Sequence, residues 1–195
     1  SVDIALKKKN VYNPVEVMNM SKEVKTNAMR MLDKAKIEYR TKEYEVDESD
    51  LSGSHAADMM GVDHGSVFKT LVLKGEKTGY LVCCIPVDAE LDLKKTARAA
   101  GDKKVEMIPM KDLLAVTGYI RGGCSPIGMK KQFPTFVEES AVLYDEIAIS
   151  AGLRGQQILI APQTLVTFIR GNFASLAFES VSYTHLRAHE TDQYL

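Results

Sequence analysis

Apolar positions recur with two different periods along this chain, and the change of period predicts where helices and strands lie. Near the start, apolar residues return every three or four positions, which predicts an amphipathic helix over 21–36 with Ser21 as its N-cap. The residues of this stripe are Val24, Ala28, Leu32 and Ala35. Alternation with a period of two predicts a strand over 39–46. Two apolar runs joined by "GEKTG" then predict a β-hairpin over 67–87.

The rest of the chain mixes short helices with short strands. Three helices are expected to end on glycines, because glycine readily adopts the left-handed conformation that closes a helix; these are Gly61, Gly101 and Gly171. Pro162 fits the first turn of the last helix. Helices are expected over 54–61, 91–101, 110–116 and 162–171, and further strands over 103–108, 133–137, 146–150 and 157–160. Because the two kinds of element do not alternate strictly, we expect an α+β fold. Its single domain would have a central mixed, mostly antiparallel sheet or partial barrel flanked by helices.

Both ends of the chain differ in pattern from its middle. Residues 1–19 precede "MSKEV", where Met20 resembles a true start, and 179–195 follow the last expected helix without a clear period. A chain of 195 residues is long enough for one domain with a sizeable core and short for two. We therefore expect a domain over 20–178, with 1–19 and 179–195 as a non-native or disordered leader and tail.

Composition excludes several classes of protein. The formal net charge is -1, with 45% hydrophobic residues, which is ordinary for a soluble globular domain. The three cysteines, Cys83, Cys84 and Cys124, fit neither a disulfide framework nor a Cys-x-x-Cys metal site. No apolar run is long enough to span a membrane. We expect a cytoplasmic protein without a metal or other cofactor, and with neither membrane nor DNA as a partner.

Lys69 is the most unusual residue of the expected hairpin. It stands in "VFKTLVL", residues 67–73, where side chains alternate between two faces of which neither is polar. A lysine there either snorkels to solvent at a sheet edge or lines a cleft, because burying an unpaired ammonium costs several kcal/mol. In a cleft, Lys69 offers a cation for a phosphate or carbonyl, and the neighbouring Thr70 offers a hydroxyl.

A glycine-rich loop, "GYIRGGCSPIG" over 118–128, is the second candidate. Paired glycines allow close approach of the backbone to a ligand and can turn amides toward one point, as anion-binding loops do. The spacing is neither that of a P-loop nor that of a dinucleotide-binding turn. A plain tight turn is the alternative.

Basic residues are concentrated in one segment. From Lys94 to Lys131 there are nine basic and three acidic residues, an excess of +6 (9 - 3) in a chain whose total is -1. This excess favours a polyanion such as nucleic acid as partner, although a solvated helix face explains such a run equally simply.

The histidines and the loop cysteine are weaker candidates. His185 and His189 have the spacing of a metal pair but lack a third ligand, and His55 and His64 are interpreted as cap or surface residues. Cys124 has no histidine near it in sequence to activate it as a nucleophile.

Four ordered motifs resemble a known family. They are "VFKTLV", "LDLKKTARAAGDKKVEM", "TGYIRGGCSPIGMKK" and "ISAGLRGQQILIAPQTL". Together they resemble the bacterial YbaK/EbsC family of trans-editing aminoacyl-tRNA deacylases, which is related to the editing domain inserted in some prolyl-tRNA synthetases. The resemblance covers about 21–178. It implies removal of cysteine mischarged onto tRNA(Pro), so the implied partners are Cys-tRNA(Pro) and, as a candidate, prolyl-tRNA synthetase.

The resemblance also implies roles for individual residues. Lys69 matches the essential lysine of the family, and Gly122 with Gly123 matches the glycine pair beside the terminal ribose. The implied substrate-binding residues are Tyr44, Thr70, Ser150, Ser125 and Pro126. The tRNA-binding residues are expected from the basic segment and not from the resemblance: Lys94, Lys95, Lys103, Lys104, Lys130 and Lys131. Leu51 or Ser52 stands where the family often has an aromatic residue, so the resemblance fixes the amino-acid preference less well than the activity.

The implied chemistry needs few protein groups. An aminoacyl ester is already activated, so an enzyme mainly has to hold it and stabilise the oxyanion, here through Lys69 and the amides of Gly122 and Gly123. No Ser-His-Asp or Cys-His set is visible in the sequence. In family members that remove cysteine, the substrate's own thiol is thought to attack its ester. Two alternatives stay open: a deacylase for another small amino acid such as Ala-tRNA(Pro), and a non-catalytic module that binds tRNA or a synthetase.

Overall fold

The computed structural model describes residues 24–179 of the chain. The predictions for Ser21, for 1–19 and for 180–195 lie outside this range. The α-helices are α2 (Asn27–Lys34), α3 (Gly53–Met60), α4 (Leu93–Ala100), α5 (Leu113–Thr117) and α6 (Pro162–Phe168). The strands are β1 (Arg40–Glu43), β2 (Phe68–Gly75), β3 (Gly79–Pro86), β4 (Val105–Met107), β5 (Thr135–Glu138), β6 (Ile147–Ser150), β7 (Gln156–Ile160) and β8 (Asn172–Ala174). Short 3-10 helices are η2 (His64–Ser66), η3 (Met110–Asp112) and η4 (Glu139–Leu143).

The described strands form two sheets. One has the order β1-β7-β6 and the other the order β4-β2-β3-β5-β8. Four of the six pairings are antiparallel, while β3 with β5 and β5 with β8 are parallel. A bridge between Val67 and Ala148 joins the two sheets just before β2 begins. The predicted α+β fold with mixed, mostly antiparallel pairing is confirmed, with the strands divided between two sheets.

Strand β2 packs against different partners along its two faces. Phe68 and Val72 belong to the larger core, which also holds residues of α2, β6, β7 and α6. Leu73, on the opposite face, packs with Ala97 of α4 and Val105 of β4. The strand is therefore apolar on both faces because each face covers a separate part of the core.

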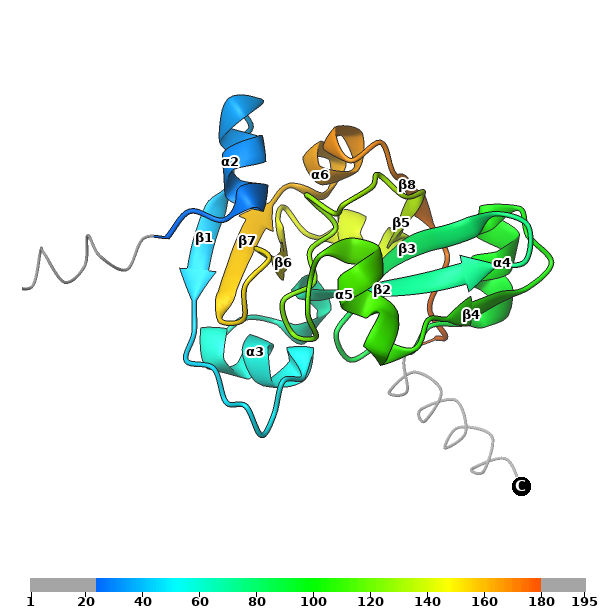
Figure 1. The fold of residues 1–195 in the computed structure, drawn as a ribbon. Coiled ribbons are helices and arrows are strands. Elements are labelled where there is room, and N and C mark those ends of the chain that lie inside the picture. The colour runs from blue at the N-terminus through cyan, green and yellow to red at the C-terminus, as the bar shows by residue number, and fades with distance from the viewer. Residues whose placement is uncertain (1–23, 180–195) are drawn as a thin grey trace, which may run out of the picture.

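The two ends of β2 lie in different surroundings. Figure 1 shows α3 and α5 beside the first half of β2, with α4 and β4 at the other end of the β2–β3 hairpin. Gly75 lies six positions after Lys69 on β2, so at about 3.3 Å per residue these two residues are about 20 Å apart. Features near Lys69 are therefore distant from features near the hairpin turn.

Two predicted helices, α2 and α6, have other bounds than expected, and one observed strand, β8, was not predicted. Helix α2 begins after Thr26, because the threonine hydroxyl accepts a hydrogen bond from the Met29 amide at 3.3 Å and caps the helix there. Val24 is therefore outside the helix and 56% exposed. Helix α6 ends at Phe168 and not at Gly171, since Arg170 adopts the left-handed conformation (φ 53°) and Gly171 N–H returns to Val166 O at 2.9 Å. Strand β8 was not predicted, because three residues carry no readable period.

Candidate functional site

A cavity of about 300 Å³ lies between the start of β2, the N-terminal end of α3, the glycine-rich loop and the paired strands β6 and β7. Five of the sequence-predicted site residues line it: Tyr44, Lys69, Thr70, Gly122 and Ser150. These residues come from parts of the chain that are more than 100 positions apart. Leu51 and Ser52, at the position where the resemblance departs from the family, both line the cavity as well.

Lys69 lines the cavity and is half-buried. Its Nζ donates a hydrogen bond to the carbonyl oxygen of Val87 at 3.2 Å. Burial lowers the pKa of this ammonium, while the nearby carboxylates of Asp88 and Glu90 act in the opposite direction. One hydrogen bond leaves two of the three ammonium protons for other acceptors, so Lys69 can hold an oxygen of a bound molecule.

Close packing fixes the segment that holds Lys69. A Cβ atom on Gly53 would lie 2.2 Å from Cγ1 of Val87, so only glycine fits at this position of α3. Val87 N–H in turn donates to Val67 O at 2.9 Å. The Val87 carbonyl that accepts the hydrogen bond from Lys69 is therefore fixed in position by packing against Gly53 and by the hydrogen bond to Val67.

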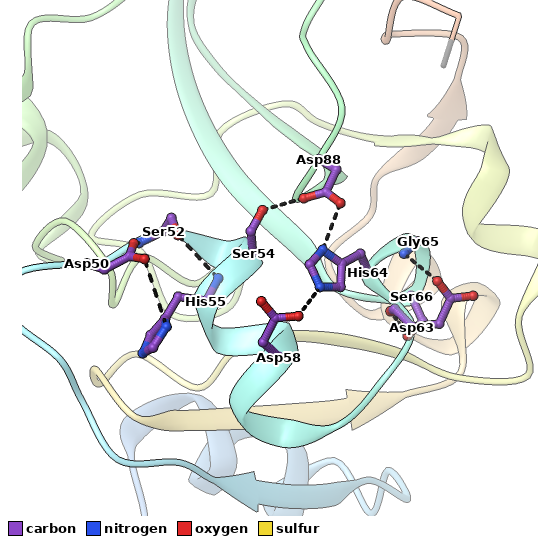
Figure 2. Close-up of polar contacts among 10 residues, drawn as sticks. All are labelled: Asp50, Ser52, Ser54, His55, Asp58, Asp63, His64, Gly65, Ser66 and Asp88. Atoms are coloured by element: carbon purple, nitrogen blue, oxygen red, sulfur yellow. Dashed lines mark hydrogen bonds and ion pairs between the residues drawn. The ribbon is translucent and has the colours of Figure 1, made fainter. Parts of the chain in front are cut away.

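Asp88, the residue after Val87, belongs to an ion-pair cluster with His64 and Asp58. Figure 2 shows His64 between two carboxylates, with Nδ1 2.7 Å from Asp88 and Nε2 2.6 Å from Asp58. The Ser54 hydroxyl donates to the same Asp88 carboxylate. The two carboxylates raise the pKa of His64, because each hydrogen bond favours the imidazolium. From the sequence, His64 was expected to be a cap or surface residue, whereas its two ion pairs link η2, α3 and the segment that follows β3.

The glycine-rich loop is shaped by its own polar groups. Thr117 Oγ accepts from Tyr119 N–H at 3.0 Å, and the Tyr119 hydroxyl donates to Ile127 O at 2.5 Å. Ser125 is fully buried, and its Oγ accepts from Ile127 N–H at 3.2 Å. These bonds fold the loop back on itself and bring Gly122 to the cavity.

The two glycines of the pair have different surroundings. Gly122 lines the cavity with φ 81°, and its N–H has no hydrogen-bond partner among residues 24–179. Gly123 is buried outside the lining, and its N–H already donates to Ile120 O at 3.0 Å. Of the two glycine amides, only that of Gly122 is without a hydrogen bond within residues 24–179, so it is the one of the pair that can stabilise an oxyanion. Ser125 and Pro126 are buried in the loop interior away from the lining, so their direct contact with a substrate stays a prediction.

The opposite wall of the cavity comes from the three-stranded sheet. Ser150 on β6 pairs with Gln157 on β7, and both side chains line the cavity. Ser150 Oγ accepts from Gly152 N–H at 3.2 Å. The sequence analysis missed Gln157, which stands beside Gln156 at the start of a strand that is otherwise apolar, "QQILI".

No residue in the cavity lining has the environment of a protein nucleophile. Cys124 lines the cavity, but burial raises its pKa to about 11, so the thiol is protonated near neutral pH. None of the lining residues is a histidine. Thr70 Oγ1 lies 3.8 Å from Cys84 Sγ and has no general base beside it in the described part of the chain.

The predicted basic segment divides between two places. Lys94, Lys95, Lys103 and Lys104 belong to α4 and the approach to β4, at the end of the hairpin remote from Lys69. Within this group Lys104 pairs with Glu106 at 3.0 Å, and Lys95 donates to Ala177 O at 2.9 Å. Lys130 and Lys131 follow the glycine-rich loop and are exposed. Arg121, which the prediction left out of the tRNA-binding set, lines the cavity.

A larger cavity, about 450 Å³, lies beside α2 and β1. None of the sequence-predicted site residues lines it, and its Lys25 and Asp33 pair with each other at 2.6 Å. We therefore place the candidate site in the smaller cavity.

Within residues 24–179, no three His, Cys, Asp or Glu side chains gather as metal ligands. His185 and His189 lie outside this range. None of the helices in the described part of the chain has the length and apolar character needed to cross a membrane.

Comparison with known proteins adds independent findings. A family profile described as "Aminoacyl-tRNA editing domain" matches residues 51–168, which hold every residue of the cavity lining except Tyr44. A relative from Enterococcus faecalis, named "Putative Cys-tRNA(Pro)/Cys-tRNA(Cys) deacylase EbsC", is 53% identical over 152 residues, covering 78% of this chain and 93% of its own. The Bacillus subtilis protein "Uncharacterized protein YwhH" is 26% identical over 124 residues, covering 64% of this chain and 78% of its own.

A solved structure has the same fold. It is described as "Crystal structure of a putative trans-editing enzyme for prolyl tRNA synthetase" and superposes with a TM-score of 0.66. The superposition covers 79% of this chain and 99% of the other at 22% identity. At this identity the likeness concerns the fold.

Proposed function

Because the chain belongs to the aminoacyl-tRNA editing domain family, we propose that it is a trans-editing deacylase that removes cysteine mischarged onto tRNA(Pro). The observation that carries the proposal is a single cavity that brings together the Lys69 ammonium and the free amide of Gly122. The 53% identical Enterococcus relative, named for this activity, supports the choice of substrate.

The cavity supplies binding and electrostatic stabilisation without a nucleophile of its own. Lys69 would hold an oxygen of the acyl-adenosine end, and Gly122 N–H would donate to the oxyanion that develops on the ester carbonyl. The attacking group would be the cysteine thiol of the substrate. Its sulfur forms a bond to the carbonyl carbon, the bond from that carbon to the ribose oxygen breaks, and the thiol proton ends on the ribose oxygen. Water then opens the cyclic thioester.

The amino-acid preference rests on residues around the cavity. Leu51 and Ser52 replace the aromatic residue that the family often has, and they leave a lining without a bulky ring on that side. This difference favours one second candidate, a deacylase for another small amino acid such as alanine on tRNA(Pro). Alanine has no thiol, so its removal would need an attacking water.

The cellular setting follows from the substrate. We place the enzyme in the cytoplasm, where charged tRNA is used, with prolyl-tRNA synthetase as the partner that selects tRNA(Pro). Lys130 and Lys131 are the basic residues of the predicted set that lie nearest in sequence to the loop carrying Gly122. They would contact phosphates of the acceptor stem.

The proposal is tested by deacylation of Cys-tRNA(Pro), Ala-tRNA(Pro) and Pro-tRNA(Pro) by the full chain under multiple turnover. Cleavage of Cys-tRNA(Pro) well above that of the other two is expected. Cleavage of Ala-tRNA(Pro) alone would show that the enzyme removes alanine and not cysteine from tRNA(Pro). Binding of tRNA without any turnover would make the chain a non-catalytic module.

A further inference from the structure

Gln157 has a buried acceptor atom that the fold leaves without a partner. The residue is 6% exposed and lines the cavity. Its Oε1 is shielded from solvent and has no hydrogen-bond partner among the described residues. Leaving such an oxygen unsatisfied is unfavourable, and native proteins rarely tolerate it without a functional reason. A ligand that donates a hydrogen bond at this point would remove the cost.

The position of Gln157 is set by the sheet. It lies on the central strand β7, paired with Ser150 on one side and with Lys42 on the other. Lys42 Nζ donates to Met60 O at 3.3 Å, and Ser150 Oγ already accepts from Gly152 N–H. Neither neighbour donates a hydrogen bond to the amide oxygen. Because the oxygen has no hydrogen bond to lose, a half-turn of the carboxamide can exchange its oxygen and nitrogen ends and present the oxygen to the cavity.

The other side chains of the lining offer hydroxyl acceptors but no carboxylate and no second carboxamide. None of the lining residues is Asp or Glu. Lys69 and Arg121 carry donors only, and Asp88 and Glu90 act on Lys69 without lining the cavity. An aminoacyl ester carries one group that mainly donates, its α-amino group, and it must find an acceptor once water is displaced.

We propose that the carboxamide oxygen of Gln157 accepts a hydrogen bond from the α-amino group of the aminoacyl ester, and so selects substrates with a free amine. This inference rests on the proposed function and goes beyond it by naming the substrate group that is recognised and the residue that recognises it. Aminoacyl groups with an acylated amine would lose a donor and gain bulk at this point.

The test uses two substrates and three variants of the full chain. The substrates are Cys-tRNA(Pro) and its analogue charged with 3-mercaptopropionate, which keeps the thiol and lacks the amine. The variants are Gln157→Leu, which removes the hydrogen-bonding group, Gln157→Met as a second apolar replacement, and Gln157→Glu, which keeps an acceptor. Gln156→Leu is the matched control, because Gln156 is adjacent and lines the other cavity.

With Cys-tRNA(Pro), Gln157→Leu and Gln157→Met are expected to lower kcat/KM roughly tenfold, mainly through KM, because the amine contact is made before the ester breaks. With the analogue lacking the amine, both variants should match the wild type. Gln157→Glu should keep most activity on Cys-tRNA(Pro), and Gln156→Leu should leave kcat/KM unchanged for both substrates. Thermal unfolding identifies a variant that fails to fold, and the other apolar variant then decides.

Equal loss on both substrates would overturn the proposal, because Gln157 would then act on the cavity and not on the amine. A loss on Cys-tRNA(Pro) that disappears with a third substrate, Cys-tRNA(Pro) whose terminal ribose lacks the 2′-hydroxyl, would also overturn it, since the partner would be that hydroxyl. Absence of turnover by the wild-type chain would instead refute the proposed function, so the two failures are distinguishable.

Discussion

Lys69 on β2 donates a hydrogen bond from its Nζ to the carbonyl oxygen of Val87 at 3.2 Å, and Val87 lies 18 positions later, directly after β3. The position of the ammonium therefore depends on the path of the chain after β3. Gly53 permits that path because it leaves room for the Val87 side chain, and Asp88 next to it is bound by Ser54 and His64. Each of these residues offers a way to move Lys69 without changing it.

Gly53→Ala is expected to lower both stability and deacylation. The new methyl would meet Val87 Cγ1 at 2.2 Å, and overpacking of this kind costs about 1–3 kcal/mol. The free energy of unfolding in urea and the steady-state rate measure the two effects. The double variant Gly53→Ala, Val87→Ala removes the contact with Cγ1 and leaves the one with Val87 Cβ at 2.8 Å, so it should recover part of the activity. Continued inactivity of the double variant would show that Val87 does not transmit the change.

Gly122→Ala is expected to reduce deacylation on the order of tenfold, because φ 81° is strained for alanine and a shifted loop misplaces the amide. Single-turnover rates measure the loss. Gly101→Ala is the matched control, since Gly101 has a similar φ of 69°, open space around it and a position beside the hairpin turn. A similar loss of activity in the two variants would mean that backbone strain, and not the site, is responsible.

Much of the fold was predictable from the sequence because local signals agree with it. The hairpin carries two apolar runs joined by a turn with glycines, and the helices before Gly61 and Gly101 each carry a terminating glycine. The pairing of β1 with β7 could not be predicted, since Arg40 and Leu159 meet across more than 100 residues. No local pattern encodes such a contact.

The site was predictable only in part, for the same reason. Lys69 was recognisable because a charged residue in an apolar strand is conspicuous, and Gln157 carried a weaker form of that signal. The difference between Gly122 and Gly123 could not be read from the sequence, because it depends on which amide already donates to Ile120 O. The link from His64 through Asp88 depends likewise on contacts between separate elements.

His64 is expected to make stability depend on pH. Its pKa is raised in the folded protein by Asp58 and Asp88. The stabilisation is therefore fully present below the ordinary pKa of histidine, about 6.5, and is lost as pH rises through the higher folded value. Urea unfolding from pH 5.5 to 8.5 should show this decline in the wild type and a smaller one in His64→Gln. Equal slopes in the two proteins would show that the two ion pairs do not contribute.

Salt is expected to weaken tRNA binding through a subset of the lysines. Affinity should fall with a slope of about 0.7–0.9 per phosphate contacted, while single-turnover rates at saturation barely change. Lys130→Gln with Lys131→Gln should flatten the slope, whereas Lys103→Gln with Lys104→Gln, at the far end of the hairpin, should change it less. An equal effect of both pairs would indicate that the tRNA follows the whole basic segment. No effect of either pair would mean that the pocket or a partner holds the tRNA.

The most direct measurement is the single-turnover deacylation of Cys-tRNA(Pro) by Lys69→Ala beside Lys74→Ala. Lys74 lies on the same strand, is exposed and faces the ring of Tyr80 at 5.3 Å, so its variant controls for loss of a lysine from β2. The cavity assignment predicts that Lys69→Ala is slower on the order of 100-fold with an unchanged unfolding midpoint, and that Lys74→Ala matches the wild type. A folded Lys69→Ala variant that deacylates Cys-tRNA(Pro) at the wild-type rate would contradict the assignment of this cavity as the editing site.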